Sequence, residues 1–129
     1  MLKNLLKPWL LPMLWCALIF YLSSTVPGAV SGPPWLDFLI KKSAHMFLYA
    51  VLWLLLYRAL KKPFYVLLFT FFYAISDEYH QSFVPGRHPG VMDIGFDTLG
   101  GTIAMIWTEK LLPKAPKLLK KWAEILEII

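Results

Sequence analysis

The sequence predicts an all-α protein, in which a four-helix transmembrane bundle is followed by a C-terminal amphipathic helix at the membrane interface. Hydrophobic residues make up 58% of the 129 residues, and the mean hydropathy of +0.57 is too high for a surface that faces water. Four apolar runs follow one another between breaks rich in proline or charge. Four spans of about 20 residues would use roughly 80 residues. We therefore expect one transmembrane domain over 1–112 and a tail over 113–129.

The four apolar runs cover residues 8–22, 44–60, 64–76 and 94–112. The first follows Lys3 and Lys7 like the charged start of a signal peptide, but only a poor small-residue cleavage site comes after it, so we expect a retained helix. Prolines precede the second and third runs, where they can begin a helix, and the fourth run ends before Pro113. None of the runs is long and uninterrupted, which favours short or tilted helices that pack on one another.

The tail from Pro116 is predicted to be an amphipathic helix. Its apolar residues stand at 118, 119, 122, 125, 126 and 129. Lysine and glutamate residues lie between them, so the apolar side chains share one helical face. A helix with basic residues opposite such a face is expected to lie on anionic lipid, although packing against a partner is the alternative.

The cysteine content excludes an intrachain disulfide, and the distribution of charge argues against nucleic acid as a partner. Cys16 is the only cysteine, so no intrachain disulfide can form. The net charge of +5 comes from basic residues that flank apolar runs and form no continuous polar patch. Membrane lipids are therefore the expected partners, and nucleic acid is not.

The distribution of basic residues predicts the orientation in the membrane. With four spans, ten Lys and Arg residues lie on the side of both termini, and three lie on the other side. Those three are Lys41, Lys42 and Arg87. Because loops rich in Lys and Arg stay inside the cell, both termini are expected in the cytoplasm of a multi-pass plasma-membrane protein.

Ionisable residues gather in one short segment of this apolar chain, "DEYHQSFVPGRHPGVMDIGFD" at 77–97. The segment holds half of the eight carboxylates, which are Asp77, Glu78, Asp93 and Asp97. The predicted topology brings it to the outer face, beside the end of the first helix ("SSTVP") and the start of the second ("KKSAH"). Carboxylates at membrane depth cost about 2.5 to 3.5 kcal/mol each, so they are expected to face protein, water or a cation.

Helical spacing groups these side chains on shared faces. Residues four apart lie on one face, as in the pairs His45 and Tyr49, Asp77 and Gln81, and Asp93 and Asp97. The candidate catalytic residues are His45, Asp77, Glu78, Arg87 and Asp93. The candidate ligand-binding residues are Lys42, Tyr49, His80, Gln81, Arg87 and Asp97. Lys41, His88 and Asp37 are expected only to sit in polar loops at the interface.

Two local patterns predict backbone geometry. Pro85-Gly86 suits the centre of a type II turn, which would fold Arg87 back over the helix ends. Gly100, Gly101 and Ala104 form a strip of small residues, which predicts close packing of the fourth helix on a neighbour.

Four sequence features resemble the VanZ-like family of small bacterial membrane proteins. They are, in order and spacing, "KKSAHMFLY", "YAISDEYHQSFVPGR", the Asp93 that follows, and "DTLGG". The resemblance covers roughly residues 20 to 108. It implies a bacterial plasma-membrane protein and a link to resistance against the glycopeptide teicoplanin, with which a member of the family is associated.

The resemblance also implies a set of motif positions in this chain. They are Lys42, His45, Tyr49, Asp77, Glu78, Gln81, Arg87, Asp93 and Gly100. The chain departs from the family pattern at Gly90, where a serine is often found, and at Asp97, where an asparagine is common.

The residues leave two functions open. In the first, Arg87 and Lys42 hold a phosphate or carboxylate of a lipid headgroup or cell-wall precursor, while the acidic residues hold Arg87 in place. In the second, the protein is a membrane-embedded enzyme for a lipid-linked phosphate or acyl substrate, with His45 or His80 as the acid or base.

No cofactor is identified from the sequence. A divalent ion is a variant of either function, since His45, Asp77, Glu78, His80 and Asp93 are suitable ligand types. Their spacing matches no established metal motif, so no metal ligands are assigned. Four short helices would form a transport path only as an oligomer.

Overall fold

The computed structural model describes residues 2–26, 28 and 32–128, with side chains from Pro8 onward. The regular structure in this part of the chain is entirely helical, which confirms the predicted all-α class. The α-helices are α1 (Leu2–Ser23), α2 (Pro34–Leu60), α3 (Pro63–Gln81), α4 (Val91–Ile106) and α5 (Lys117–Ile125). A π-helical turn, η1 (Trp107–Leu111), and a 3-10 turn, η2 (Leu112–Lys114), connect α4 to α5.

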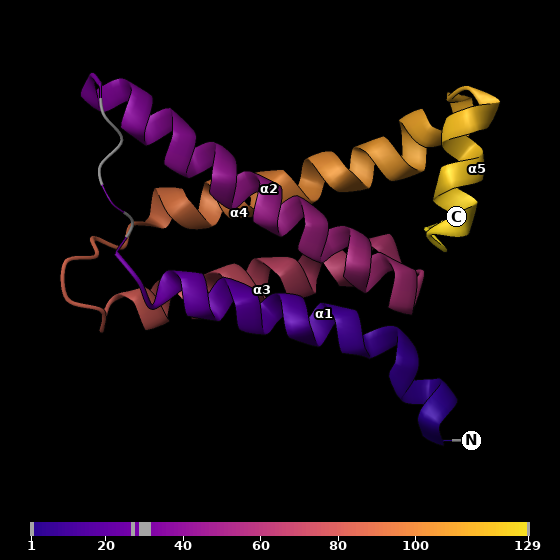
Figure 1. The fold of residues 1–129 in the computed structure, drawn as a ribbon, viewed down its shortest axis with the longest axis horizontal. Helices are drawn as coiled ribbons and strands as arrows, with labels where there is room; N and C mark the ends of the chain where they lie inside the picture. The colour runs from indigo at the N-terminus through magenta and orange to yellow at the C-terminus, as the bar shows by residue number, and fades with distance from the viewer. Residues whose placement is uncertain (1, 27, 29–31, 129) are drawn as a thin grey trace.

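The first four helices run back and forth and pack on one another (Figure 1). The most extensive contact is between α2 and α4, and α3 packs on α4, while α1 packs on α2 and α3. The N-terminus, the α2–α3 turn and α5 lie at one end of the molecule, and the α3–α4 loop lies at the other. The segment rich in ionisable residues therefore meets the end of α1 and the start of α2, as expected.

Prolines begin two of the helices, as the sequence indicates. Pro34 and Pro63 occupy the first turns of α2 and α3, where a missing N–H costs nothing. The α2 helix ends where Lys61 adopts a left-handed conformation (φ 53°) and its N–H donates to the Tyr57 carbonyl at 2.8 Å.

The fourth helical stretch differs from the expectation. Regular α-helix stops at Ile106, but helical turns continue through η1 and η2, so the helix does not end before Pro113. Pro113 lies in the first turn of η2, where its fixed φ suits the backbone.

The strip of small residues on α4 brings the backbones of α2 and α4 into contact, as predicted. A Cβ atom added to Gly100 would lie 2.2 Å from the Met46 carbonyl oxygen. Only glycine leaves room for that carbonyl. The close approach sets α2 beside α4 along the face that carries the candidate site.

Apolar and polar side chains are distributed as in a membrane protein. Large apolar side chains such as Phe47, Phe72 and Tyr79 are exposed on the outer faces, whereas Asp77 and Asp97 are buried. Within the described residues, α2 is the one helix that is both long and apolar enough to cross a membrane, and Pro8–Ser23 is a shorter apolar helix. The arrangement of four transmembrane spans remains a prediction.

The tail forms the predicted helix, α5, and folds back to the α2–α3 turn. Arg58 pairs with Glu127 at 2.6 Å, and Lys61 Nζ donates to the Glu127 carbonyl at 2.6 Å. The apolar side chains of α5, including Trp122 and Ile125, remain exposed. Its position on a lipid surface is untested and stays a prediction.

Candidate functional site

The loop between α3 and α4 contains the predicted type II turn. The Arg87 N–H donates to the Val84 carbonyl at 3.1 Å, and Gly86 at the third position has φ +82°. A type II turn requires a positive φ at this position, which glycine adopts without strain. The turn directs Arg87 back over the helix ends, which confirms the expectation.

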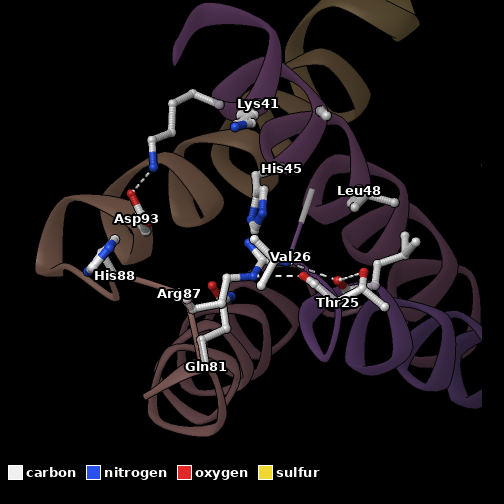
Figure 2. Close-up of a pocket in the computed structure, with 13 residues that line it drawn as sticks. Thr25, Val26, Lys41, His45, Leu48, Gln81, Arg87, His88 and Asp93 are labelled. Carbon is white, nitrogen blue, oxygen red and sulfur yellow. Dashed lines mark hydrogen bonds and ion pairs between the residues drawn. The ribbon is translucent and has the colours of Figure 1, made fainter. Parts of the chain in front are cut away.

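Arg87 binds the end of α1 through backbone oxygens. Its Nε donates to the Thr25 carbonyl and its Nη2 donates to the Leu22 carbonyl, each at 2.9 Å (Figure 2). No carboxylate of the described residues pairs with Arg87, so the expectation that acidic residues hold it in place is wrong. The physical reason is that carbonyls at a helix C-terminus lack intrahelical donors and accept those of the guanidinium.

Two ion pairs join one face of α2 to one face of α4. Lys42 pairs with Asp93, and His45 Nδ1 lies 3.2 Å from Asp97 Oδ1. Asp93 and Asp97 are four residues apart, so their side chains lie one above the other along α4. Asp97 is completely buried, whereas Lys42, His45 and Asp93 are partly exposed. The pairs therefore run from the surface into the bundle.

Asp77 anchors α3 to α1 inside the bundle. Its Oδ2 accepts hydrogen bonds from Ser23 Oγ at 2.8 Å and from Gln81 Nε2 at 3.1 Å. The buried Tyr49 hydroxyl faces the Asp77 carboxylate without the geometry of a hydrogen bond. We call Ser23, His45, Tyr49, Asp77, Gln81 and Asp97 the buried cluster.

Two other candidate site residues near the end of α3, Glu78 and His80, have different surroundings. Glu78 is buried, and its Oε1 accepts a hydrogen bond from the Gly90 N–H, at the start of α4. His80 stacks on Phe20 with ring centroids 4.0 Å apart, and its Nε2 lies 3.5 Å from Ser24 Oγ. Glu78 therefore positions α4, and the structure places His80 outside both the pocket and the buried cluster.

A pocket of about 400 Å³ opens at this end of the bundle, above the buried cluster (Figure 2). We call it the entrance pocket. Its polar lining comes from Thr25, Lys41, Lys42, His45, Gln81, Arg87, His88 and Asp93. Its apolar lining comes from Leu22, Val26, Ala44 and Leu48. His45 and Gln81 belong to both the pocket and the buried cluster, so the two are continuous.

The structure brings together most of the predicted site residues and adds others. Lys41 and His88, which were expected only to sit in polar loops at the interface, line the entrance pocket. Lys41 also pairs with Asp37 at 2.8 Å. Ser23 was not selected, because a serine at a helix end has no distinctive signal. The position of the first helix beside Asp77 is what makes it a partner.

The electrostatics of the pocket favour an anion. Three cationic side chains, Lys41, Lys42 and Arg87, line it; Lys41 is paired with Asp37 and Lys42 with Asp93, whereas Arg87 has no carboxylate partner among the described residues. The His45–Asp97 pair opens onto the same space and has the form of an oriented acid or base.

The fold and the site define a class: a small helical membrane protein with a cationic pocket at one end of its bundle. The chain belongs to the VanZ/LLP1 family, whose model matches residues 8–112 and whose members are membrane proteins. The resemblance noted in the sequence is thereby confirmed. Neither the search of curated proteins nor the search of solved structures returns a match.

Proposed function

We propose that this protein is a four-span bacterial plasma-membrane protein that binds an anionic lipid headgroup or a lipid-linked cell-envelope precursor in the entrance pocket. The observation that carries the proposal is that three cationic side chains converge on that pocket, two of them in ion pairs, Lys41 with Asp37 and Lys42 with Asp93. Lys41, Lys42 and Arg87 line it together with a single carboxylate, Asp93. A phosphate can therefore accept several charge-assisted hydrogen bonds there.

The distribution of basic residues supports an outward-facing pocket with both termini in the cytoplasm. Lys61, Lys62 and Lys114 belong to the end of the molecule opposite the pocket, together with the N-terminus and α5. Loops and tails with many lysines and arginines remain on the cytoplasmic side. On this basis, a molecule in the entrance pocket would meet the outer surface of the plasma membrane.

The apolar lining supports a lipid rather than a free anion. Leu22, Val26, Ala44 and Leu48 form a wall beside the cations. Exposed apolar side chains continue from it along the outer faces of α1 and α2, where acyl chains would lie. A lipid could enter sideways from the bilayer, with its head on Lys42 and Arg87.

The family suggests the physiological setting. A protein that holds a cell-envelope precursor at the outer surface would change the access of a glycopeptide such as teicoplanin to its target. This route to drug resistance depends on the headgroup that the pocket selects. Sugar-bearing and peptide-bearing precursors would compete with ordinary phospholipids for the same cations.

A second candidate function is catalysis on the same class of ligand. The observation that favours it is the His45–Asp97 pair, with Nδ1 and Oδ1 at 3.2 Å, which opens onto the cationic pocket. Asp97 would orient the imidazole and Arg87 would stabilise charge on a phosphoryl or acyl group. Release of phosphate or fatty acid from a bound lipid by the wild type, but not by His45→Gln, would favour the enzyme.

Native mass spectrometry of the full chain in detergent tests the binding proposal. Phosphatidylglycerol should bind more tightly than zwitterionic phosphatidylcholine. Lys42→Gln removes a pocket cation and leaves Asp93 unpaired, so phosphatidylglycerol should bind at least tenfold more weakly, or about 1.4 kcal/mol. Lys42→Arg should retain most of the affinity.

Lys114→Gln is the matched control, since it removes the same charge from an exposed position at the opposite end. It should bind phosphatidylglycerol as the wild type does. Equal losses in Lys42→Gln and Lys114→Gln would show that only the net charge matters, and would contradict the proposed pocket.

A further inference from the structure

The buried cluster brings three metal-ligating side chains together from three helices. His45 on α2, Asp77 on α3 and Asp97 on α4 each offer one ligand atom, and these atoms all lie within 4.8 Å of one another. The residues are far apart in the sequence, and only the packing of α3 and α2 on α4 makes them neighbours. The proposed lipid function uses none of their carboxylate oxygens.

Both carboxylates have an oxygen with no partner. Asp97 is fully buried and Asp77 is 3% exposed. Asp97 Oδ2 and Asp77 Oδ1 accept no hydrogen bond from the residues that the structure describes. A buried carboxylate oxygen that lacks a partner is costly, and a cation or a proton can satisfy it. Two such oxygens beside one imidazole point to a bound cation.

The Tyr49 hydroxyl is an independent observation at the same place. Tyr49 is fully buried, and its hydroxyl has no hydrogen-bond partner within the described part of the chain. It interacts electrostatically with both Asp77 and Asp97. A buried hydroxyl without a partner, near two carboxylates, is suited to ligate a cation or to hold a water bound to it.

The neighbouring lysine and arginine side chains of the described residues do not pair with these carboxylates. Lys42 pairs with Asp93, and Arg87 donates to the carbonyls of Leu22 and Thr25. Across residues 8–26 and 32–128, no lysine or arginine forms an ion pair with Asp77 or Asp97. His45 is their only basic neighbour in a pair, and an imidazole that binds a metal is neutral.

We infer that His45, Asp77 and Asp97 form a binding site for one divalent ion of the Mn²⁺ or Zn²⁺ type at the floor of the entrance pocket. Carboxylates suit Mn²⁺ and Zn²⁺, and the imidazole favours these ions over Ca²⁺ and Mg²⁺, which prefer oxygen ligands alone. This inference goes beyond the proposed function and does not depend on it.

The His45–Asp97 distance already suits a shared ion, and only the three-atom cluster, whose ligand atoms lie within 4.8 Å of one another, would have to contract. His45 Nδ1 and Asp97 Oδ1 are 3.2 Å apart, and ligand atoms on a tetrahedral ion are about 3.4 Å apart. Asp77 would approach by a side-chain rotation. Because His45 and Gln81 also line the entrance pocket, the remaining coordination positions face the space where an anion would bind.

Metal titration of the full chain in detergent, after treatment with a chelator, tests the inference without any lipid. Calorimetry should detect one Mn²⁺ or Zn²⁺ ion per chain. Asp97→Asn and Asp77→Asn keep the side-chain shape and should each weaken binding at least a hundredfold. His80→Gln is the matched control, because His80 lies at the same end outside the cluster, and it should bind the metal as the wild type does.

Electron paramagnetic resonance of bound Mn²⁺ identifies the ligands independently of stability. The wild type should show a nitrogen coupling from one imidazole, which His45→Gln should lose and His80→Gln should keep. If an aspartate variant fails to fold, the comparison of His45→Gln with His80→Gln still tests whether His45 is a metal ligand. Absence of stoichiometric binding by the wild type, or a nitrogen coupling that persists in His45→Gln, would overturn the inference.

Discussion

Among single residues, Arg87 has the clearest structural role, because it joins the α3–α4 loop to the end of α1. Its two hydrogen bonds, to the carbonyls of Leu22 and Thr25, leave the rest of the guanidinium beside the entrance pocket. A planar guanidinium can hold two oxygens and still present donors to an anion, whereas an ammonium group is a point charge. Arg87 therefore forms part of the pocket wall and contributes a positive charge to it.

Arg87→Lys should impair the protein although it keeps the charge. Lysine cannot place donors on both carbonyls, so we expect a loss of about 1 kcal/mol in stability and weaker binding of phosphatidylglycerol. Thermal unfolding in detergent and lipid affinity should be measured on the same samples. Arg58→Lys is the control, because Arg58 binds Glu127 at the other end of the bundle, and its lipid affinity should equal that of the wild type. Wild-type stability and affinity in Arg87→Lys would contradict this role.

The sequence selected residues that the structure largely brings to one end of the bundle, but it did not identify all of their partners. The spacing of Asp93 and Asp97 identified a common face, and Pro85-Gly86 identified the turn that brings Arg87 over the helix ends. The partners of Arg87 are backbone carbonyls, and no side-chain pattern identifies a particular carbonyl. His80 was selected by residue type alone, and its rotation about α3 turns it toward Phe20 instead.

At the scale of the helices, the contact between α2 and α4 holds the site together. Both pairs across this contact, Lys42 with Asp93 and His45 with Asp97, need the two backbones to be close. Gly100 permits the approach, since its backbone lies against the Met46 carbonyl. Separating the helices would disrupt the pocket and the buried cluster together.

Gly100→Ala should therefore destabilise the bundle strongly. Its Cβ would lie 2.2 Å from the Met46 carbonyl oxygen, and a helix backbone cannot yield as a flexible side chain does. We expect a loss of about 3 kcal/mol or failure to assemble, from overpacking. Gly95→Ala is the matched control on the same helix, since nothing lies within 4 Å of its added Cβ. It should unfold at or slightly above the wild-type temperature, because alanine favours helix by up to about 1 kcal/mol.

The apolar runs predicted which helices form more accurately than they predicted the first and last residues of those helices. The second run was identified over 44–60, but α2 begins at Pro34, and its first turns carry apolar residues interrupted by Asp37, Lys41 and Lys42. The fourth stretch continues past Pro113 because proline is acceptable in the first turn of η2. An apolar run indicates the part of a helix that would face lipid, and a helix can continue beyond that part. Helix ends therefore cannot be read from hydrophobicity alone.

At the scale of the whole molecule, the basic residues are distributed unequally between the two ends of the bundle. Cations on the pocket side are few and line the pocket, whereas most lysines lie toward the other end with the tail and the α2–α3 turn. Composition alone predicted the membrane class, since 58% hydrophobic residues cannot be hidden inside a chain of this length.

Cysteine labelling of intact cells tests the proposed orientation. In a Cys16→Ala background, an impermeant maleimide should label His88→Cys, which is exposed beside the pocket, and should not label Lys114→Cys. Permeabilised cells should show labelling at both positions, which controls for reactivity. The reverse pattern in intact cells would place the pocket in the cytoplasm and contradict the topology.

The central claim is that the entrance pocket holds the anionic group of a lipid, and an experimental structure with bound phosphatidylglycerol tests it most directly. A phosphorothioate analogue would mark the headgroup by the anomalous signal of its sulfur. We expect this signal in the entrance pocket, within hydrogen-bond distance of Lys42 or Arg87. A pocket without headgroup density, with the signal confined to the outer faces of the helices, would contradict it.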